Sequence, residues 1–230
     1  MVKTAITRHG WEVIGIEDVF DTAVNTAMET LDRLHTTAES HHRAMILEVM
    51  GRDTGWIALQ AGIAGGADVI LIPEIPCDIQ AVAAKVRERN RRGVRFSILG
   101  VAEGARRIGG ETLYQAERDL GGVPRLGGIG EAVAAQLKAV MDVDVRVTVS
   151  GHVQRGGSPS AYDRLLASRF GAYVVQLIAE GRLGHMVALR DDRLVAVPPD
   201  EAVGHQKRVP VDGDVLAIAR GLGVGLGDAV

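Results

Sequence analysis

Residues 150–160, with the sequence SGHVQRGGSPS, place a histidine, a glutamine and an arginine on a glycine-rich frame. The segment follows the alternating sequence VRVTVS, which predicts a strand, and precedes a long sequence with helical spacing. Glycine lets a backbone approach a ligand closely, and the guanidinium of Arg155 can bind a phosphate through two parallel hydrogen bonds. The pattern favours a ligand-binding loop, although an isolated histidine such as His152 is more often a hydrogen-bonded structural residue.

Polar residues follow the other predicted strands as well. The four strand ends read Met50-Gly51-Arg52, Pro73-Glu74, Ala102-Glu103-Gly104 and Ser150-Gly151-His152. Ligands of open α/β sheets bind at the carboxyl ends of the strands, so we expect these residues to share one site. Several arginines with one carboxylate suit an anionic, hydroxylated ligand such as a sugar phosphate. A lone arginine at a strand end, however, is more often a surface ion-pair partner.

Helical and strand patterns alternate along the chain. The helices are predicted at 20–40, 53–67, 78–93, 129–141 and 161–179, and the strands at 43–50, 68–73, 95–103, 143–150, 185–190 and 193–198. Asp21 is the expected N-cap of the first helix, and residues 104–128 are expected to be irregular. Arg146 and Thr148 share one face of their strand. This order predicts an α/β fold, a doubly wound and mainly parallel sheet with helices on both faces.

The composition excludes several classes of protein. The chain has 230 residues and a net charge of -3, which argues against a nucleic-acid partner, and its basic run at 85–95 is typical of a solvated helix end. Cys77 is the only cysteine, so no intrachain disulfide can form. No apolar run is long enough to span a membrane, and the N-terminus lacks the pattern of a signal peptide. We therefore expect a cytoplasmic protein without membrane or nucleic-acid partners.

Three further patterns predict no site. The terminal sequence GLGVGLG imitates a dinucleotide-binding fingerprint, but it follows no clear strand and opens no helix. His41 and His42 have no carboxylate or cysteine at the spacing of zinc ligands, so no metal site is expected. Ser158 and Ser160 lie outside any nucleophile-elbow pattern.

Three segments, taken together, closely resemble the bacterial-type 6-phosphofructokinase family. They are AESHHRAMILEVMGRDTGWIALQAGIAGGADVILIPEIP, VAEGA and RVTVSGHVQRGGSPSAYDRLLASRFGAY, and they match the family in order and spacing. The resemblance extends from about residue 20 to the C-terminus. It implies transfer of a phosphoryl group to O1 of fructose 6-phosphate in glycolysis, with Mg²⁺ and either ATP or pyrophosphate as the donor.

The resemblance assigns roles at the strand ends. Met50, Gly51 and Arg52 match a Met-Gly-Arg motif that contacts the fructose and whose arginine stabilises the transferring phosphoryl group. Glu103 matches the carboxylate that binds sugar hydroxyls. The pair that holds the sugar and its 6-phosphate corresponds to His152 and Arg155.

The resemblance also implies a homo-oligomer. Arg43 and Arg146 match two arginines that reach the 6-phosphate from a neighbouring subunit. Asp68 lies where some relatives place an effector-site acid, but His35 and Val94 stand where those relatives carry basic effector ligands. Control by nucleotides is therefore not implied for this chain.

The family's donor half is missing from the resemblance. Its first glycine-rich segment, its Gly-Gly-Asp motif and its Thr-Ile-Asp-Asn-Asp motif, which holds the catalytic base, do not occur in this sequence. Residues 1–19 resemble a remnant of the N-terminal lobe, a helix followed by a strand, and residues 20–230 the part that binds fructose 6-phosphate. Without its sheet neighbours that strand is expected to be poorly anchored, so that Trp11, Val13, Ile14 and Ile16 either pack against another surface or lie exposed.

Three readings follow. The first is a 6-phosphofructokinase whose activity is impaired by truncation. The second is a non-catalytic remnant or pseudoenzyme that still binds a sugar phosphate, and the third is an assembly error or a gene fragment without a selected function. ATP and pyrophosphate both remain compatible with the sequence as donors.

Overall fold

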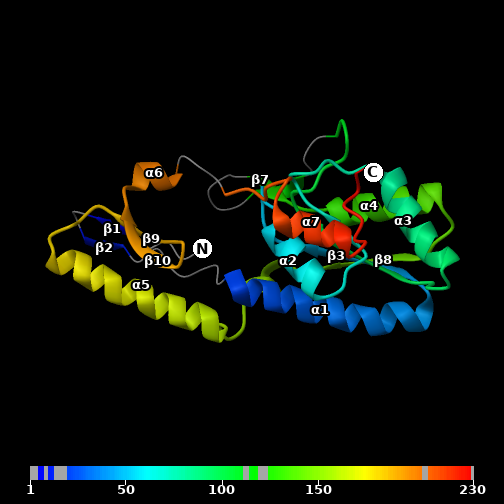
Figure 1. Cartoon of the computed structure of the whole chain (residues 1–230). Coiled ribbons are helices and arrows are strands. Elements are labelled where there is room, and N and C mark those ends of the chain that lie inside the picture. The colour runs from blue at the N-terminus through cyan, green and yellow to red at the C-terminus, as the bar shows by residue number, and fades with distance from the viewer. Residues whose placement is uncertain are drawn as a thin grey trace. The chain divides into compact units, whose positions relative to one another are not determined.

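A computed structural model of the chain describes residues 5–7, 10–12, 20–110, 114–118, 124–203 and 207–228. The chain divides into two compact units (Figure 1). The larger unit comprises Val24–Gln154 and Arg208–Val230, and the smaller one comprises Met1–Ala23 and Arg155–Lys207. Each unit has its own sheet and its own hydrophobic core.

The larger unit is built on a parallel four-stranded sheet with the order β4-β5-β3-β8. Its strands are β3 (Ala44–Val49), β4 (Val69–Leu71), β5 (Ser97–Ala102) and β8 (Val145–Val149). Every residue of β3, β4 and β5 is buried, as expected for strands covered on both faces. The sheet confirms the predicted α/β class.

Helices cover both faces of this sheet (Figure 1). On one face α3 (Ile79–Arg91) and α4 (Ile129–Val140) pack Val82 and Leu137 into the cluster that contains Ile46 and Leu99. On the other face α2 (Trp56–Ala64) lies so close that a Cβ at Gly62 would stand 2.6 Å from Ile70 Cδ1. The unit also contains α7 (Asp214–Gly221) and most of α1 (Phe20–His41).

The glycine-rich tail lies beside β4. Gly225 forms a parallel bridge with Val69, and its carbonyl accepts a hydrogen bond of 2.9 Å from the Ile70 amide. Gly227 adopts a φ of 77°, and a Cβ there would lie 2.6 Å from Leu71 Cδ2. These glycines therefore serve close backbone packing against the sheet.

The smaller unit combines one long helix with an antiparallel sheet. The helix α5 (Ala161–Ala179) packs Phe170, Val174 and Leu177 against Val187. The sheet order is β10-β9-β1-β2, with β9 (Met186–Arg190), β10 (Arg193–Val197), β1 (Ala5–Thr7) and β2 (Gly10–Glu12). A short helix, α6 (Pro199–Val203), follows β10. None of the helices in the described ranges is both long and apolar enough to cross a membrane.

Three sequence-based expectations were wrong. The described part of the N-terminus is a hairpin of β1 and β2, not a helix, and β1 pairs with β9 through Ala5 and Met186. These two strands therefore have sheet neighbours, while residues 13, 14 and 16 lie outside the described residues. Residues 104–128 contain a second hairpin, β6 (Tyr114–Arg118) and β7 (Pro124–Leu126). Asp21 lies within the first turn of α1, one residue beyond its start, so it is not the N-cap.

Candidate functional site

Three adjacent strands of the larger sheet end at the same edge. β3 pairs in parallel with β5 on one side and with β8 on the other, and Val49 lies opposite Ala102 while Glu48 lies opposite Val149. The segments that follow these strands begin at Met50, Glu103 and Ser150, so the topology brings them together. This placement agrees with the expectation that the polar strand ends share one edge.

Glu103 holds the turn that follows β3. Its backbone amide donates a hydrogen bond of 2.9 Å to Val49 O, and its Oε1 accepts bonds from the amides of Gly51 (3.2 Å) and Arg52 (2.9 Å). Its other oxygen, Oε2, makes no hydrogen bond within the part of the chain that the structure describes. Glu103 can thus hold the turn with one oxygen and offer the other to a ligand.

The turn itself has an unusual backbone. Arg52 adopts a φ of 50°, which is uncommon for a residue with a side chain. The turn packs directly on the backbone of Gly104, where a Cβ would collide with Arg52 O. Gly104 must therefore be a glycine for the turn to occupy this position.

The segment after β8 forms a short 3₁₀ helix, η1 (Gly151–Arg155). His152 is exposed on it, and Arg155, its last residue, is exposed and belongs to the smaller unit. Gln154 is the buried member of the helix, with 2% of its surface exposed. Its Oε1 accepts hydrogen bonds from Met50 N (2.9 Å) and Ser150 Oγ (2.6 Å).

Arg43 and Arg146 lie away from this cluster within the larger unit. Arg43 precedes β3 and Arg146 is the second residue of β8, so both are near the amino ends of their strands. Both pair with Asp144: the distance from its carboxylate is 2.6 Å to Arg43 Nε and 3.3 Å to Arg146 Nε. Asp144 was not singled out in the sequence, because an isolated acid before a strand carries no pattern.

Two other carboxylates bind backbone amides of the larger unit: Glu48, which the sequence analysis missed, and Glu74, which it placed at a strand end without a role of its own. Glu48, on β3, is 3% exposed and accepts hydrogen bonds from the amides of Gly128 (3.1 Å) and Gly130 (2.8 Å). Burial raises the pKa of Glu48 above its ordinary value, although these two amides act in the opposite direction. Glu74 accepts from the amides of Gly55 and Val209. A charged residue inside the apolar run AMILEV was the one available signal for Glu48.

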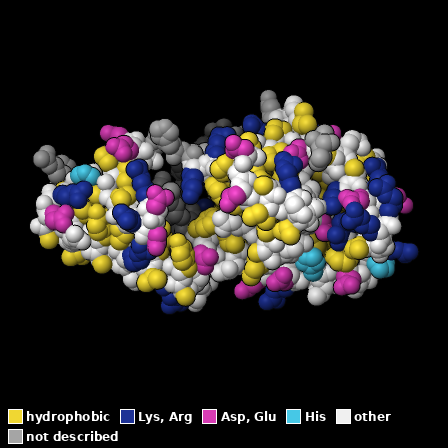
Figure 2. Space-filling model, viewed as in Figure 1, with side chains coloured by type: hydrophobic (Ala, Val, Ile, Leu, Met, Phe, Trp, Pro, Cys, Tyr) yellow, Lys and Arg dark blue, Asp and Glu magenta, His cyan; other side chains and the backbone are white. Residues whose placement is uncertain are grey.

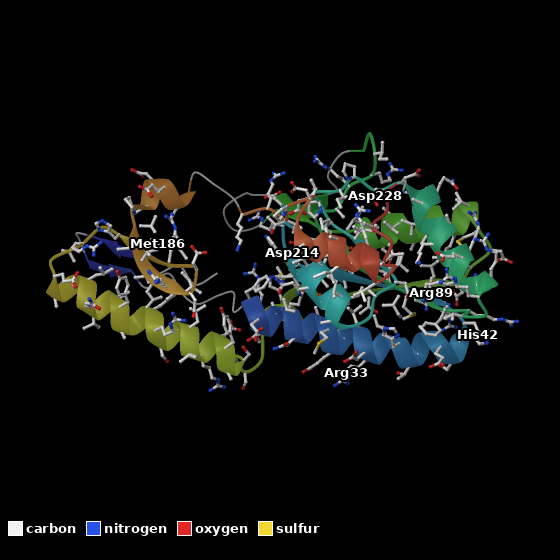
Figure 3. The ribbon with its side chains drawn as sticks, in the orientation of Figure 1. Arg33, His42, Arg89, Met186, Asp214 and Asp228 are labelled. Carbon is white, nitrogen blue, oxygen red and sulfur yellow. The ribbon has the colours of Figure 1, made fainter. Side chains whose placement is uncertain are left out.

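An ion pair lies at the amino ends of the strands, on the far side of the sheet from the polar strand ends. Asp68 accepts a hydrogen bond of 2.8 Å from Ile98 N and pairs with Arg89 at 2.6 Å. Arg89 and His42 are found at the same end of the larger unit (Figure 3). Lysines and arginines gather over α3 (Figure 2), where Lys85 and Arg92 both pair with Glu88. The basic run, predicted as a solvated helix end, thus includes the C-terminal part of α3 and is partly ion-paired.

The described residues include no group of three or more histidine, cysteine, aspartate or glutamate side chains arranged to hold a metal ion. The strand-end carboxylates of Glu48, Glu74 and Glu103 are instead hydrogen-bonded to backbone amides.

The fold and these strand ends define an α/β protein with a candidate ligand site at the carboxyl ends of a parallel sheet. The phosphofructokinase family model matches residues 13–178, so the chain belongs to this family. It is 57% identical over 209 residues to an ATP-dependent 6-phosphofructokinase of Chloroflexus aurantiacus, and 52% identical over 209 residues to ATP-dependent 6-phosphofructokinase 1 of a Synechocystis species. Each match covers 91% of this chain and 57% of the relative, so the chain spans little more than half of those proteins.

Solved structures agree with this assignment. The phosphofructokinase of Pichia pastoris in its T-state matches 95% of this chain and 22% of its own, with a TM-score of 0.66 and 30% identity. A pyrophosphate-dependent phosphofructokinase from Marinobacter aquaeolei matches 98% of this chain and 54% of its own, with a TM-score of 0.69. Because that second identity is 22%, it supports the fold alone.

Proposed function

We propose that the chain binds fructose 6-phosphate and serves the 6-phosphofructokinase reaction, with the Met50–Arg52 turn and Glu103 contacting the sugar. The observation that carries the proposal is that Glu103 Oε1 accepts hydrogen bonds from the Gly51 and Arg52 amides. The other carboxylate oxygen, Oε2, can then accept a hydrogen bond from a sugar hydroxyl. Arg52 would stabilise the transferring phosphoryl group. His152 and Arg155, which match the family's motif, would hold the sugar and its 6-phosphate.

The remaining parts of the proposal follow from the relatives. ATP, with Mg²⁺, is the donor we favour, because the relatives at 57% and 52% identity are named ATP-dependent.

We infer a homo-oligomer in which Arg43 and Arg146 contribute to a neighbour's site, since both lie away from their own chain's Met50–Arg52 turn. A cytoplasmic location suits the single, buried Cys77. We also propose that 1–19 is the remnant of a larger lobe and 20–230 the sugar-phosphate part.

A second candidate function is sugar-phosphate binding without catalysis. It is favoured by the strand-end carboxylates, which are hydrogen-bonded to backbone amides, and by the lack of a metal-holding group among the residues described. A coupled assay with fructose 6-phosphate, Mg²⁺ and either ATP or pyrophosphate separates the two. Turnover supports the kinase, and binding without turnover supports the second candidate.

Calorimetric titration with fructose 6-phosphate tests the binding itself. Wild type is expected to bind, and both Arg52→Ala and Arg155→Ala are expected to weaken binding by tenfold or more, because a hydrogen bond to a charged group is worth about 1.5–3 kcal/mol. Arg33→Ala is the control, since Arg33 is exposed on α1 (Figure 3). Absence of binding by wild type, or equal weakening by Arg33→Ala, would contradict the proposal.

A further inference from the structure

Gln154 differs from its neighbours on η1. His152, Val153 and Arg155 are exposed, with Val153 at 74%, whereas Gln154 is 2% exposed. A buried amide of this kind is costly unless its polar atoms are hydrogen-bonded. Its side chain therefore belongs to the internal structure of the edge, while its neighbours face outward.

The contacts of Gln154 join two strand ends. The pairing of β3 with β8 ends at Glu48 and Val149, and Ser150 N then donates a hydrogen bond of 3.0 Å to Glu48 O. Beyond this point the two strand ends are joined by Gln154 Oε1, which accepts one hydrogen bond from Met50 N after β3 and another from Ser150 Oγ after β8. The connection between the strands thus continues past the sheet through one side chain.

Gln154 and Glu103 together hold three successive backbone amides. Gln154 accepts from Met50 N, and Glu103 accepts from Gly51 N and Arg52 N. The chain at Arg52 is in the left-handed region, with a φ of 50°, a conformation that needs support from its surroundings. These amides fix the direction in which the Arg52 side chain leaves the backbone.

We propose that Gln154 is a positioning residue for Arg52: it fixes the Met50–Arg52 turn and couples that turn to the segment carrying His152. It makes this contribution through Met50 N, without touching the ligand. The expected effect of Gln154 on sugar-phosphate affinity rests on the proposed function. The hydrogen bond by which Gln154 holds the Met50–Arg52 turn does not depend on it.

Amide hydrogen exchange of the unliganded full chain, followed by NMR, tests the grip. Gln154→Met keeps the length of the side chain but removes the acceptor, and is expected to speed exchange at Met50 about tenfold, the equivalent of one lost hydrogen bond. Exchange at Leu99, in the core of β5, should stay unchanged, because a general loss of stability would speed both amides. Gln154→Glu keeps an acceptor oxygen and should restore slow exchange. Val153→Ala, at an exposed position of η1, is the matched control.

Titration of the same variants with fructose 6-phosphate completes the test. Gln154→Met should bind about tenfold more weakly than wild type, and Gln154→Glu should recover most of the affinity. If the Met50 amide of Gln154→Met exchanges as slowly as that of wild type, the proposal is overturned whatever the titrations give. Faster exchange with unchanged affinity overturns the coupling to the site. If wild type itself does not bind, the proposed function fails, and exchange at Met50 alone decides whether Gln154 holds the turn.

Discussion

Glu48, which is buried on β3, and Glu74, which is partly buried after β4, both accept hydrogen bonds at the start of a helix. The helices α2 and α4 begin after glycine N-caps, Gly55 and Gly128, which have no side chain to accept a hydrogen bond from the first turn. Glu74 accepts from Gly55 N, and Glu48 accepts from Gly128 N and Gly130 N. Glu48 therefore does for α4 the work that serine or aspartate does at an ordinary N-cap, because Gly130 lies in the first turn, whereas Glu74 binds the amide of the N-cap residue of α2.

The raised pKa of Glu48 predicts a specific pH dependence. As pH rises, Glu48 ionises in the unfolded chain before it ionises in the native state. Ionisation therefore favours the unfolded chain, and the free energy of unfolding falls as pH rises from the ordinary pKa to the raised one. The loss of stability is complete above both pKa values. Wild type is therefore expected to lose stability relative to Glu48→Gln as pH rises through and above the ordinary glutamate pKa of 4.5. Urea unfolding of both proteins across this range measures the difference.

Comparing wild type with Glu48→Gln cancels the contributions that other titrating groups make to the pH dependence of stability. Burial also raises the pKa of Asp68, but Asp68 is present in both and contributes equally. The charges of Glu103 and Glu131 raise the pKa of Glu48 further. Glu131→Gln, at an exposed position, should therefore reduce the pH dependence only slightly. Parallel pH curves for wild type and Glu48→Gln would contradict the prediction.

At the scale of elements, the start of α5 depends on a residue far away in the chain. Asp163, 5% exposed, accepts hydrogen bonds from Thr22 N (2.8 Å) and Thr22 Oγ1 (2.6 Å). Ser160 Oγ caps the helix by accepting from Asp163 N, and Thr22 Oγ1 accepts from Ser160 N at 2.9 Å. The first turns of α1 and α5 are thus joined by one hydrogen-bond network.

Asp163→Ala is expected to destabilise the smaller unit by about 1–3 kcal/mol, because it leaves the buried Thr22 donors without their acceptor. Asp163→Asn, which keeps one acceptor oxygen, should lose less. The measurement is urea unfolding together with amide exchange at Thr22, and the control is Asp200→Ala, at an exposed position of α6. An effect of Asp163→Ala no larger than that of Asp200→Ala would refute this role.

The elements that the sequence predicted well are those whose signal is local. Apolar periodicity located α1 and α3, and continuous apolar runs located β3 and β5, because each pattern reflects burial within a few residues. The β1–β2 and β6–β7 hairpins were missed, since their three- to five-residue strands depend on partners rather than on their own pattern.

The candidate site follows the same division. The strand-end positions of Met50, Arg52 and Glu103 could be predicted, because parallel topology alone brings such ends together. The grip of Glu103 on the turn and the inward direction of Gln154 could not, since both depend on the placement of side chains across neighbouring strands.

At the scale of the whole molecule, the two units differ in how much apolar surface they bury. The core of the larger unit draws on all four strands of its sheet and on α3 and α4, and it includes Leu71, Leu99 and Leu137, each fully buried. Among the residues that the structure describes, the core cluster of the smaller unit has four buried members: Phe170, Val174, Leu177 and Val187. Burial of apolar area is the main source of stability, so the smaller unit should be the less stable of the two.

Hydrogen exchange in increasing urea, read by mass spectrometry, tests this difference. Peptides covering 186–197 should lose protection at a lower urea concentration than peptides covering 44–49 and 97–102. Leu177→Ala should lower the midpoint of the first set and Leu99→Ala that of the other two, each by removing a fully buried side chain worth about 2–5 kcal/mol. A single common midpoint that both variants shift equally would show one cooperative unit and contradict the prediction. Separate midpoints would mean that the Met50–Arg52 turn and Glu103, which lie in the larger unit, stay assembled after the smaller unit has unfolded.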